Sequence, residues 1–159
     1  MNLPYIIVVS ILTFILPLTG AWVQKKIQGI SFSFDLLGKW FIFSAVGLRL
    51  FMAGCRQIFS PAFTAEEIFH IHSSEVYPIV RELGFANLCF GLIGIFSLTK
   101  SHWRIVSAFG SGLYYGLAAI LHVTKDASGV NELFALITDT LIFSFLLIYF
   151  LKQYKTETT

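Results

Sequence analysis

The sequence predicts an all-α protein: a polytopic transmembrane helical bundle of about five spans, forming a single transmembrane domain over residues 1–159. Of its residues 56% are hydrophobic and only 13% are charged, whereas soluble domains carry about 25% charged residues. The mean hydropathy is +0.76. The apolar residues form runs near the ~20 residues that cross a bilayer as a helix. Together these observations exclude a soluble enzyme and a disordered chain.

The apolar runs predict the order of the spans. No basic residue precedes the first run, unlike a signal peptide, so we expect this run to be retained as a helix. The later four spans are expected to form a four-helix core, with the first span outside it or at a subunit contact. The expected spans are residues 3–23, 39–60, 77–98, 104–123 and 130–151.

Basic residues are unevenly divided between the two sides of the membrane. Cytoplasmic loops are enriched in Lys and Arg, so the richer side predicts an outside N-terminus and a cytoplasmic C-terminus. The net charge of +2, without a basic block, argues against a nucleic-acid partner. The richer side holds Lys25, Lys26, Lys39, Lys100, Arg104, Lys152 and Lys155; the poorer side holds Arg56 and Lys125.

The longest connection, residues 59–76, is therefore expected outside. Thr64-Ala-Glu-Glu67 has the pattern of a capping box, in which the Thr side chain caps a helix and the Glu reaches back. The apolar residues that follow predict a short amphipathic helix over about 64–72, lying along the outer interface.

Polar residues within the spans recur at seven-residue spacing, which is close to two helical turns and places each pair on one helix face. Ionisable groups inside a membrane are costly and indicate function. If these faces meet, they form a charged pocket that opens outward. The predicted ligand-binding residues are Arg49, Arg56, Glu82, Asn87, Tyr115, His122, Asn131, Glu132 and Asp139.

Other interpretations of the same residues stay open. Charged pairs can simply hold helices together, and a basic residue near a helix end, such as Arg81 or Lys39, can extend to the interface. Glu82, Asp139 and His122 are the candidates for acid–base catalysis.

The sequence predicts no metal site. Its nearest approach to one is a single Glu-x-x-His formed by Glu67 and His70, with His72 beside it. Di-iron bundles use two such motifs and two further carboxylates.

Glycines mark the third and fourth spans. Gly112-Leu-Tyr-Tyr-Gly116 is a G-x-x-x-G pattern, which allows helix backbones to approach closely. With Gly84, Gly91 and Gly94 in the preceding span, it predicts a tight hairpin of the third and fourth spans.

Three strings resemble a family of small, uncharacterised bacterial inner-membrane proteins with DoxX-like architecture, over roughly residues 40–150. The resemblance implies a four-helix membrane bundle in the bacterial inner membrane, with some relatives associated with quinol oxidation or thiol redox. The strings are Arg49-Leu-Phe-Met-Ala-Gly-Cys-Arg-Gln57, Arg81-Glu-Leu-Gly-Phe-Ala-Asn-Leu88 and Tyr114-Tyr-Gly-Leu-Ala-Ala-Ile-Leu-His122.

The leading functional hypothesis is a binding protein whose pocket holds a small amphiphile, a quinone or a lipid headgroup. The alternatives are a membrane-embedded enzyme with acid–base or redox chemistry, a small proton-coupled transporter, and a structural subunit. Expected partners are membrane lipids, a second copy of the chain or a partner membrane subunit. Whether the protein is an enzyme, and which cofactor it uses, stay open at this stage.

Overall fold

The computed structural model describes residues 3–124 and 129–157, and this part of the chain is helical, with no strand. Five of its helices are long and apolar enough to cross a membrane, which confirms the predicted fold class. All five are longer than predicted. The five are Leu3–Gln28, Phe34–Phe59, Ser74–Phe96, His102–Thr124 and Val130–Lys155.

The first two spans each contain a central π-helical turn. The first consists of α1 (Leu3–Ser10), η1 (Ile11–Ile15) and α2 (Leu16–Gln28), and the second of α3 (Phe34–Phe41), η2 (Ile42–Leu48) and α4 (Arg49–Phe59). The first span ends at Gly29, whose φ of 64° is in the left-handed region that glycine tolerates. The second begins earlier than predicted because the Ser33 side chain caps it, accepting a hydrogen bond from the Leu36 N–H at 3.1 Å.

The two π-helical turns lie against each other and expose carbonyl groups to neighbouring side chains. The Ser44 hydroxyl donates to the Leu12 carbonyl at 2.5 Å, and the Tyr115 hydroxyl donates to the Ala45 carbonyl at 3.0 Å. In a membrane interior these carbonyls have no water to bind, so side chains from adjacent helices must satisfy them. π-helical turns are frequent at functional sites, and η2 ends immediately before Arg49.

The outer connection differs from the sequence prediction. It contains η3 (Phe63–Ile68), a π-helical turn, and η4 (Ser74–Val76), a 3-10 turn. The capping-box prediction was wrong, because Thr64 lies inside η3 and the residue at the N-cap, Ala62, makes no side-chain cap bond. Helical structure already begins at Pro61, and proline is well suited to a first helical turn. The helix ends at Ile68, short of the predicted residue 72.

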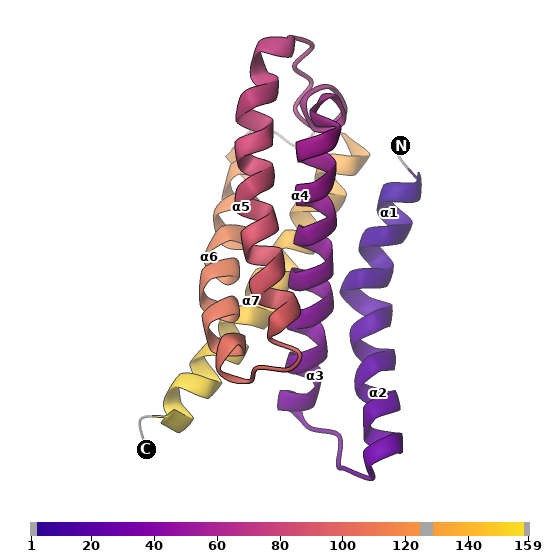
Figure 1. Cartoon of the computed structure of the whole chain (residues 1–159), viewed down its shortest axis with the longest axis vertical. Helices are drawn as coiled ribbons and strands as arrows, with labels where there is room; N and C mark the ends of the chain where they lie inside the picture. The colour runs from indigo at the N-terminus through magenta and orange to yellow at the C-terminus, as the bar shows by residue number, and fades with distance from the viewer. Residues whose placement is uncertain (1–2, 125–128, 158–159) are drawn as a thin grey trace.

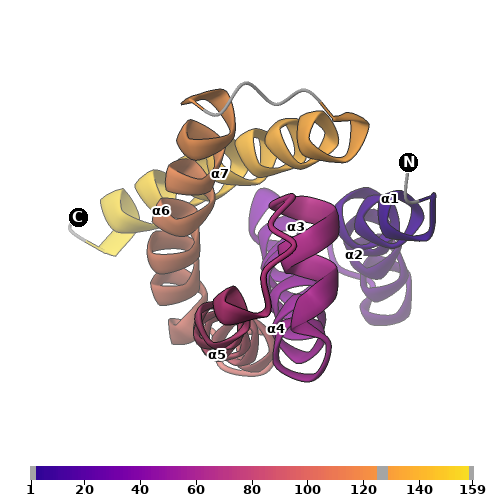
Figure 2. The same ribbon diagram turned by 90° about the horizontal axis from the view of Figure 1, so that it is seen from above.

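The remaining helices are α5 (Tyr77–Phe96), α6 (His102–Thr124) and α7 (Val130–Glu157). Figure 1 shows α4 beside α5 and α6 beside α7, and these two pairs make the most extensive helix contacts. Viewed from above, α7 runs obliquely across the bundle, and α1 and α2 lie outside α3 and α4 (Figure 2). The first span therefore packs on the outside of the other four.

Glycines explain the close approach of α5 to the second span. A Cβ on Gly94 would lie 2.6 Å from the Gly47 Cα, and one on Gly91 would lie 2.4 Å from the Phe51 backbone nitrogen. The predicted tight hairpin of the third and fourth spans was therefore wrong. Gly112 and Gly116 face Leu146 and Phe143 of α7 instead, because a small-residue pattern predicts a close contact but not which helix makes it.

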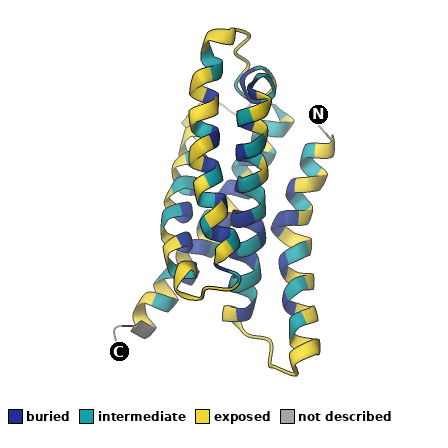
Figure 3. Ribbon diagram, viewed as in Figure 1, coloured by how far each residue is buried: buried dark blue, intermediate teal, exposed yellow. Residues whose placement is uncertain are grey.

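Burial follows the same arrangement. Buried residues line the inner faces of the helices and exposed ones the periphery (Figure 3). Many of the exposed residues are large and apolar, among them Ile27 and Leu117. Such an apolar periphery is what a helical bundle presents to lipid.

Candidate functional site

The site centres on a buried ion pair between the second and fifth spans. Arg49 is the first residue of α4, directly after η2, and its Nη2 lies 2.8 Å from Oδ1 of Asp139 on α7. The two side chains are only 10% and 9% exposed. Thr138 Oγ1 accepts a second bond from the same nitrogen at 3.3 Å. Asp139 and Thr138 thus hold one of the two terminal nitrogens of Arg49.

The other terminal nitrogen of Arg49, Nη1, is buried and has no hydrogen-bond partner among the described residues. An unsatisfied buried donor costs about 1–3 kcal/mol, and a charged one costs more. A guanidinium has five N–H donors in a fixed fork. Nη1 therefore keeps donor capacity that no described residue uses.

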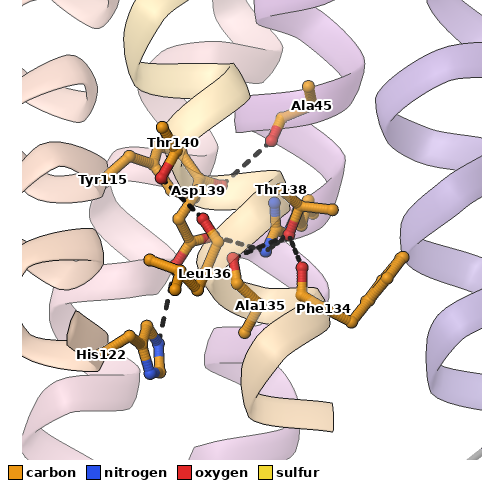
Figure 4. A network of polar contacts seen from close by, with 10 residues as sticks. Ala45, Tyr115, His122, Phe134, Ala135, Leu136, Thr138, Asp139 and Thr140 are labelled. Carbon is orange, nitrogen blue, oxygen red and sulfur yellow. Dashed lines mark hydrogen bonds and ion pairs between the residues drawn. The ribbon is translucent and has the colours of Figure 1, made fainter. Parts of the chain in front are cut away.

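His122 lies on the other side of the carboxylate. Its Nε2 is 3.9 Å from Oδ2 of Asp139, and its side chain is 22% exposed. Figure 4 shows Asp139 between His122 of α6 and Thr138. Asp139 therefore places one oxygen toward Arg49 and the other toward the imidazole of His122.

Tyrosine rings enclose the guanidinium. The Tyr115 ring centroid is 5.2 Å from Arg49 Cζ, a cation–π arrangement, while its hydroxyl bonds the η2 carbonyl. The Tyr5 side chain of α1 lies within hydrogen-bonding reach of the same guanidinium, and its ring meets Phe134 edge-on at 6.3 Å. Helices α1, α4, α6 and α7 all contribute to the site.

A second polar contact joins α5 to α4. The Asn87 side-chain NH₂ donates to Gln57 Oε1 at 2.7 Å, and both residues are buried. Tyr114, whose ring packs edge-on against Tyr115 with centroids 5.8 Å apart, lies next to Asn87. Asn87 is thus connected to α4 through Gln57 and to the site through Tyr114.

The structure does not bring all predicted residues together. Arg56 and Glu82 are both exposed, and the Arg56 guanidinium lies over the Phe63 ring at 3.4 Å from its centroid. Gly54 of α4 packs closely against Gly84 of α5, so the faces that carry these glycines are the ones in contact. Arg56 and Glu82 lie on the other faces of these helices.

Glu132 has a different role from Asp139, two turns further along the same helix. Its carboxylate accepts from the Gly129 N–H at 3.2 Å and lies 3.2 Å from His70 Nε2. Glu132 therefore connects the outer connection to the start of α7, next to half-buried Asn131. His70 makes this contact from a left-handed backbone conformation, with φ at 56°.

Metal binding has no support in the described part of the chain, where no three His, Cys, Asp or Glu residues form a group that could hold an ion. Of the metal candidates Glu67, His70 and His72, His70 is the one that contacts another carboxylate, that of Glu132.

Some site residues were missed from sequence. Thr138 adjoins Asp139, and Gln57 follows Arg56, but neither is charged. Tyr5 belongs to a span without charges, so nothing in the spacing connected it to Arg49. All three are uncharged residues with a polar side-chain atom in an apolar span. Such residues are too frequent in these spans to identify a site.

The fold and the site define a class: a polytopic helical membrane protein whose interior holds a buried Arg–Asp pair bordered by a histidine. Within that class the chain matches, over residues 1–159, a family described as "Family of unknown function (DUF6790)", and it belongs to that family. Comparisons with curated proteins and with solved structures found no match.

Proposed function

We propose that this protein binds a small amphiphilic ligand inside the membrane, through a headgroup that accepts a hydrogen bond from Arg49. The observation that carries the proposal is the buried Nη1 of Arg49, which has no partner among the described residues. A charged donor left unsatisfied in a membrane interior is costly. A bound acceptor would remove that cost.

The surroundings of Arg49 favour an anionic or carbonyl headgroup with an apolar tail. Tyr115 and Tyr5 offer aromatic surface beside the guanidinium, and the helix surfaces outside the core are apolar. A quinone, a carboxylate amphiphile and a lipid headgroup share this chemistry. The outward-opening pocket, the bacterial inner membrane and the DoxX-like relationship remain parts of the proposal.

The proposal can be tested by calorimetric titration of the protein in lipid nanodiscs with dodecanesulfonate, a permanently anionic amphiphile, after subtraction of empty nanodiscs. We expect one saturable site in the wild type. Arg49→Lys keeps a charge for Asp139 but lacks the second terminal nitrogen, so it should weaken binding at least about tenfold, as expected for a lost charged hydrogen bond. Arg81→Gln, which removes an exposed arginine, should bind as the wild type does.

Saturable binding that is equal in the wild type and Arg49→Lys would overturn the proposal, as would the lack of a saturable site in the wild type. Because Arg49→Lys preserves the buried positive charge, it is less disruptive to folding than removal of the charge. Its elution as a single species in size-exclusion chromatography checks that it is folded.

The contact between His122 and Asp139 favours a second candidate, proton movement across the membrane. His122 is partly exposed, and its Nε2 lies 3.9 Å from Oδ2 of Asp139, whose other oxygen forms the ion pair with Arg49. Liposomes containing a pH-sensitive dye and an imposed voltage test this function. Transport predicts a proton flux that Asp139→Asn abolishes, and a wild-type flux equal to that of empty liposomes rejects it.

A further inference from the structure

The charge balance around Arg49 has a consequence for which ligands can bind. Arg49 and Asp139 cancel each other at 2.8 Å, so the cluster has no net charge when His122 is neutral. An anionic headgroup at Arg49 Nη1 would add one uncompensated negative charge to side chains that are about nine-tenths buried. Burying an unpaired charge is costly unless a nearby group changes its protonation state.

The ionisable groups around the site limit which residue can supply the compensating charge. Arg49 is already positive. Asp139 Oδ1 accepts a hydrogen bond from Arg49 at 2.8 Å, and protonation of this carboxylate would weaken that contact. The carboxylate of Glu132 contacts His70, whose side chain is 63% exposed and lies in the outer connection. The tyrosines become negative rather than positive when they ionise. The ionisable groups around the site are Arg49 of α4, Asp139 and Glu132 of α7, His122, Tyr114 and Tyr115 of α6, Tyr5 of α1 and His70 of the outer connection.

We propose that an anionic ligand binds at Arg49 together with one proton, and that His122 takes up this proton. The step rests on the ligand-binding function proposed above and deepens it. The anion accepts a hydrogen bond from Arg49 Nη1, and a proton from solvent converts neutral His122 to imidazolium. Asp139 Oδ2, 3.9 Å from His122 Nε2, stabilises the imidazolium. The cluster returns to zero net charge.

Two consequences follow. Affinity for a permanently anionic amphiphile rises as the pH falls, by up to about tenfold per pH unit in the range where one proton is taken up. A neutral amphiphile with a carbonyl headgroup brings no charge, so its affinity does not change with pH. The affinity of the site therefore depends on pH for anionic ligands and not for neutral ones.

The test is calorimetric titration with dodecanesulfonate at pH 7.5 in two buffers that differ in ionisation enthalpy, because the difference in observed heat measures proton uptake. We expect about one proton per bound anion in the wild type and in His102→Gln, a matched control at the other end of α6. His122→Gln should take up none. Dodecanamide, the neutral probe, should bind the wild type without proton uptake.

The outcomes separate the two proposals. Dodecanesulfonate binding without proton uptake, or with the same uptake in His122→Gln, overturns the role of His122 and leaves Arg49 binding intact. The lack of a saturable dodecanesulfonate site in the wild type overturns both. The buffer comparison in the wild type needs no variant, so binding without proton uptake overturns the role of His122 even if His122→Gln does not fold.

Discussion

At the scale of single residues, the ion pair is held in place by the penalty for separating it. Both side chains are about nine-tenths buried, so each would become an uncompensated charge without the other. Breaking a buried pair from one side costs about 3–5 kcal/mol, whereas replacing both partners by apolar residues can be nearly neutral. The pair therefore holds Arg49 in a fixed position, even if its net contribution to stability is small.

We expect Asp139→Asn to lower the free energy of unfolding by about 3–5 kcal/mol, because it leaves the Arg49 charge unpaired. Unfolding monitored by circular dichroism in a mild detergent measures this. Glu82→Gln is the matched control, since this carboxylate is exposed, and it should change stability by less than about 0.5 kcal/mol. Arg49→Met combined with Asp139→Leu should be less harmful than Asp139→Asn alone. Equal effects of Asp139→Asn and Glu82→Gln would contradict the account.

At the scale of helices, four of the five spans form two closely packed pairs, and the ion pair is one of the contacts between these pairs. Glycine brings α5 against the second span, while α6 packs on α7. Arg49 comes from the first pair and Asp139 from the second. The position of Arg49 therefore depends on how closely α5 approaches the backbone of the second span.

Gly91→Ala should destabilise the protein by about 1–3 kcal/mol, because the added Cβ would lie 2.4 Å from the Phe51 backbone nitrogen and push the helices apart. Gly112→Ala is the control. Its Cβ would lie 3.5 Å from Leu146 Cβ, an ordinary contact, and alanine favours helix more than glycine does. Thermal unfolding of both variants measures the difference; a Gly112→Ala variant as unstable as Gly91→Ala would be evidence against the two-pair description.

At the scale of the whole molecule, the basic residues gather at one end. The loop after α2, the α5–α6 connection and the C-terminal end of α7 all lie at the lower end in Figure 1. At this end Gln24 Oε1 accepts bonds from Lys39 Nζ at 3.1 Å and Trp40 Nε1 at 2.8 Å. Arg104 Nε donates to the Ser97 carbonyl at 3.0 Å. The positive-inside rule predicts that this end is cytoplasmic.

Cysteine labelling tests the orientation. In a chain in which Cys55 and Cys89 are replaced by Ser, Glu75→Cys should react with a membrane-impermeant maleimide in intact cells. Lys100→Cys, in the connection at the opposite end, should react only after the membrane is permeabilised. The reverse pattern would show that the N-terminus is cytoplasmic.

The sequence predicted the features that depend on a single helix better than those that depend on contacts between helices. Hydropathy alone predicted the fold class and where the spans lie, because apolar length determines a spanning helix. Seven-residue spacing selected Arg49, Asp139 and His122. It equally selected Arg56 and Glu82, which are exposed, because spacing within one helix does not determine which face meets a neighbour. The same limit explains why the partner of the Gly112–Gly116 pattern was assigned wrongly.

The central claim is that Arg49 holds a ligand headgroup in the membrane interior. Native mass spectrometry of protein purified in mild detergent tests it most directly, with the wild type, Arg49→Lys and Arg81→Gln prepared in parallel. The account predicts a small-molecule adduct on the wild type and Arg81→Gln that is lost from Arg49→Lys. An adduct retained equally by all three proteins, or a wild type without any adduct, would contradict it.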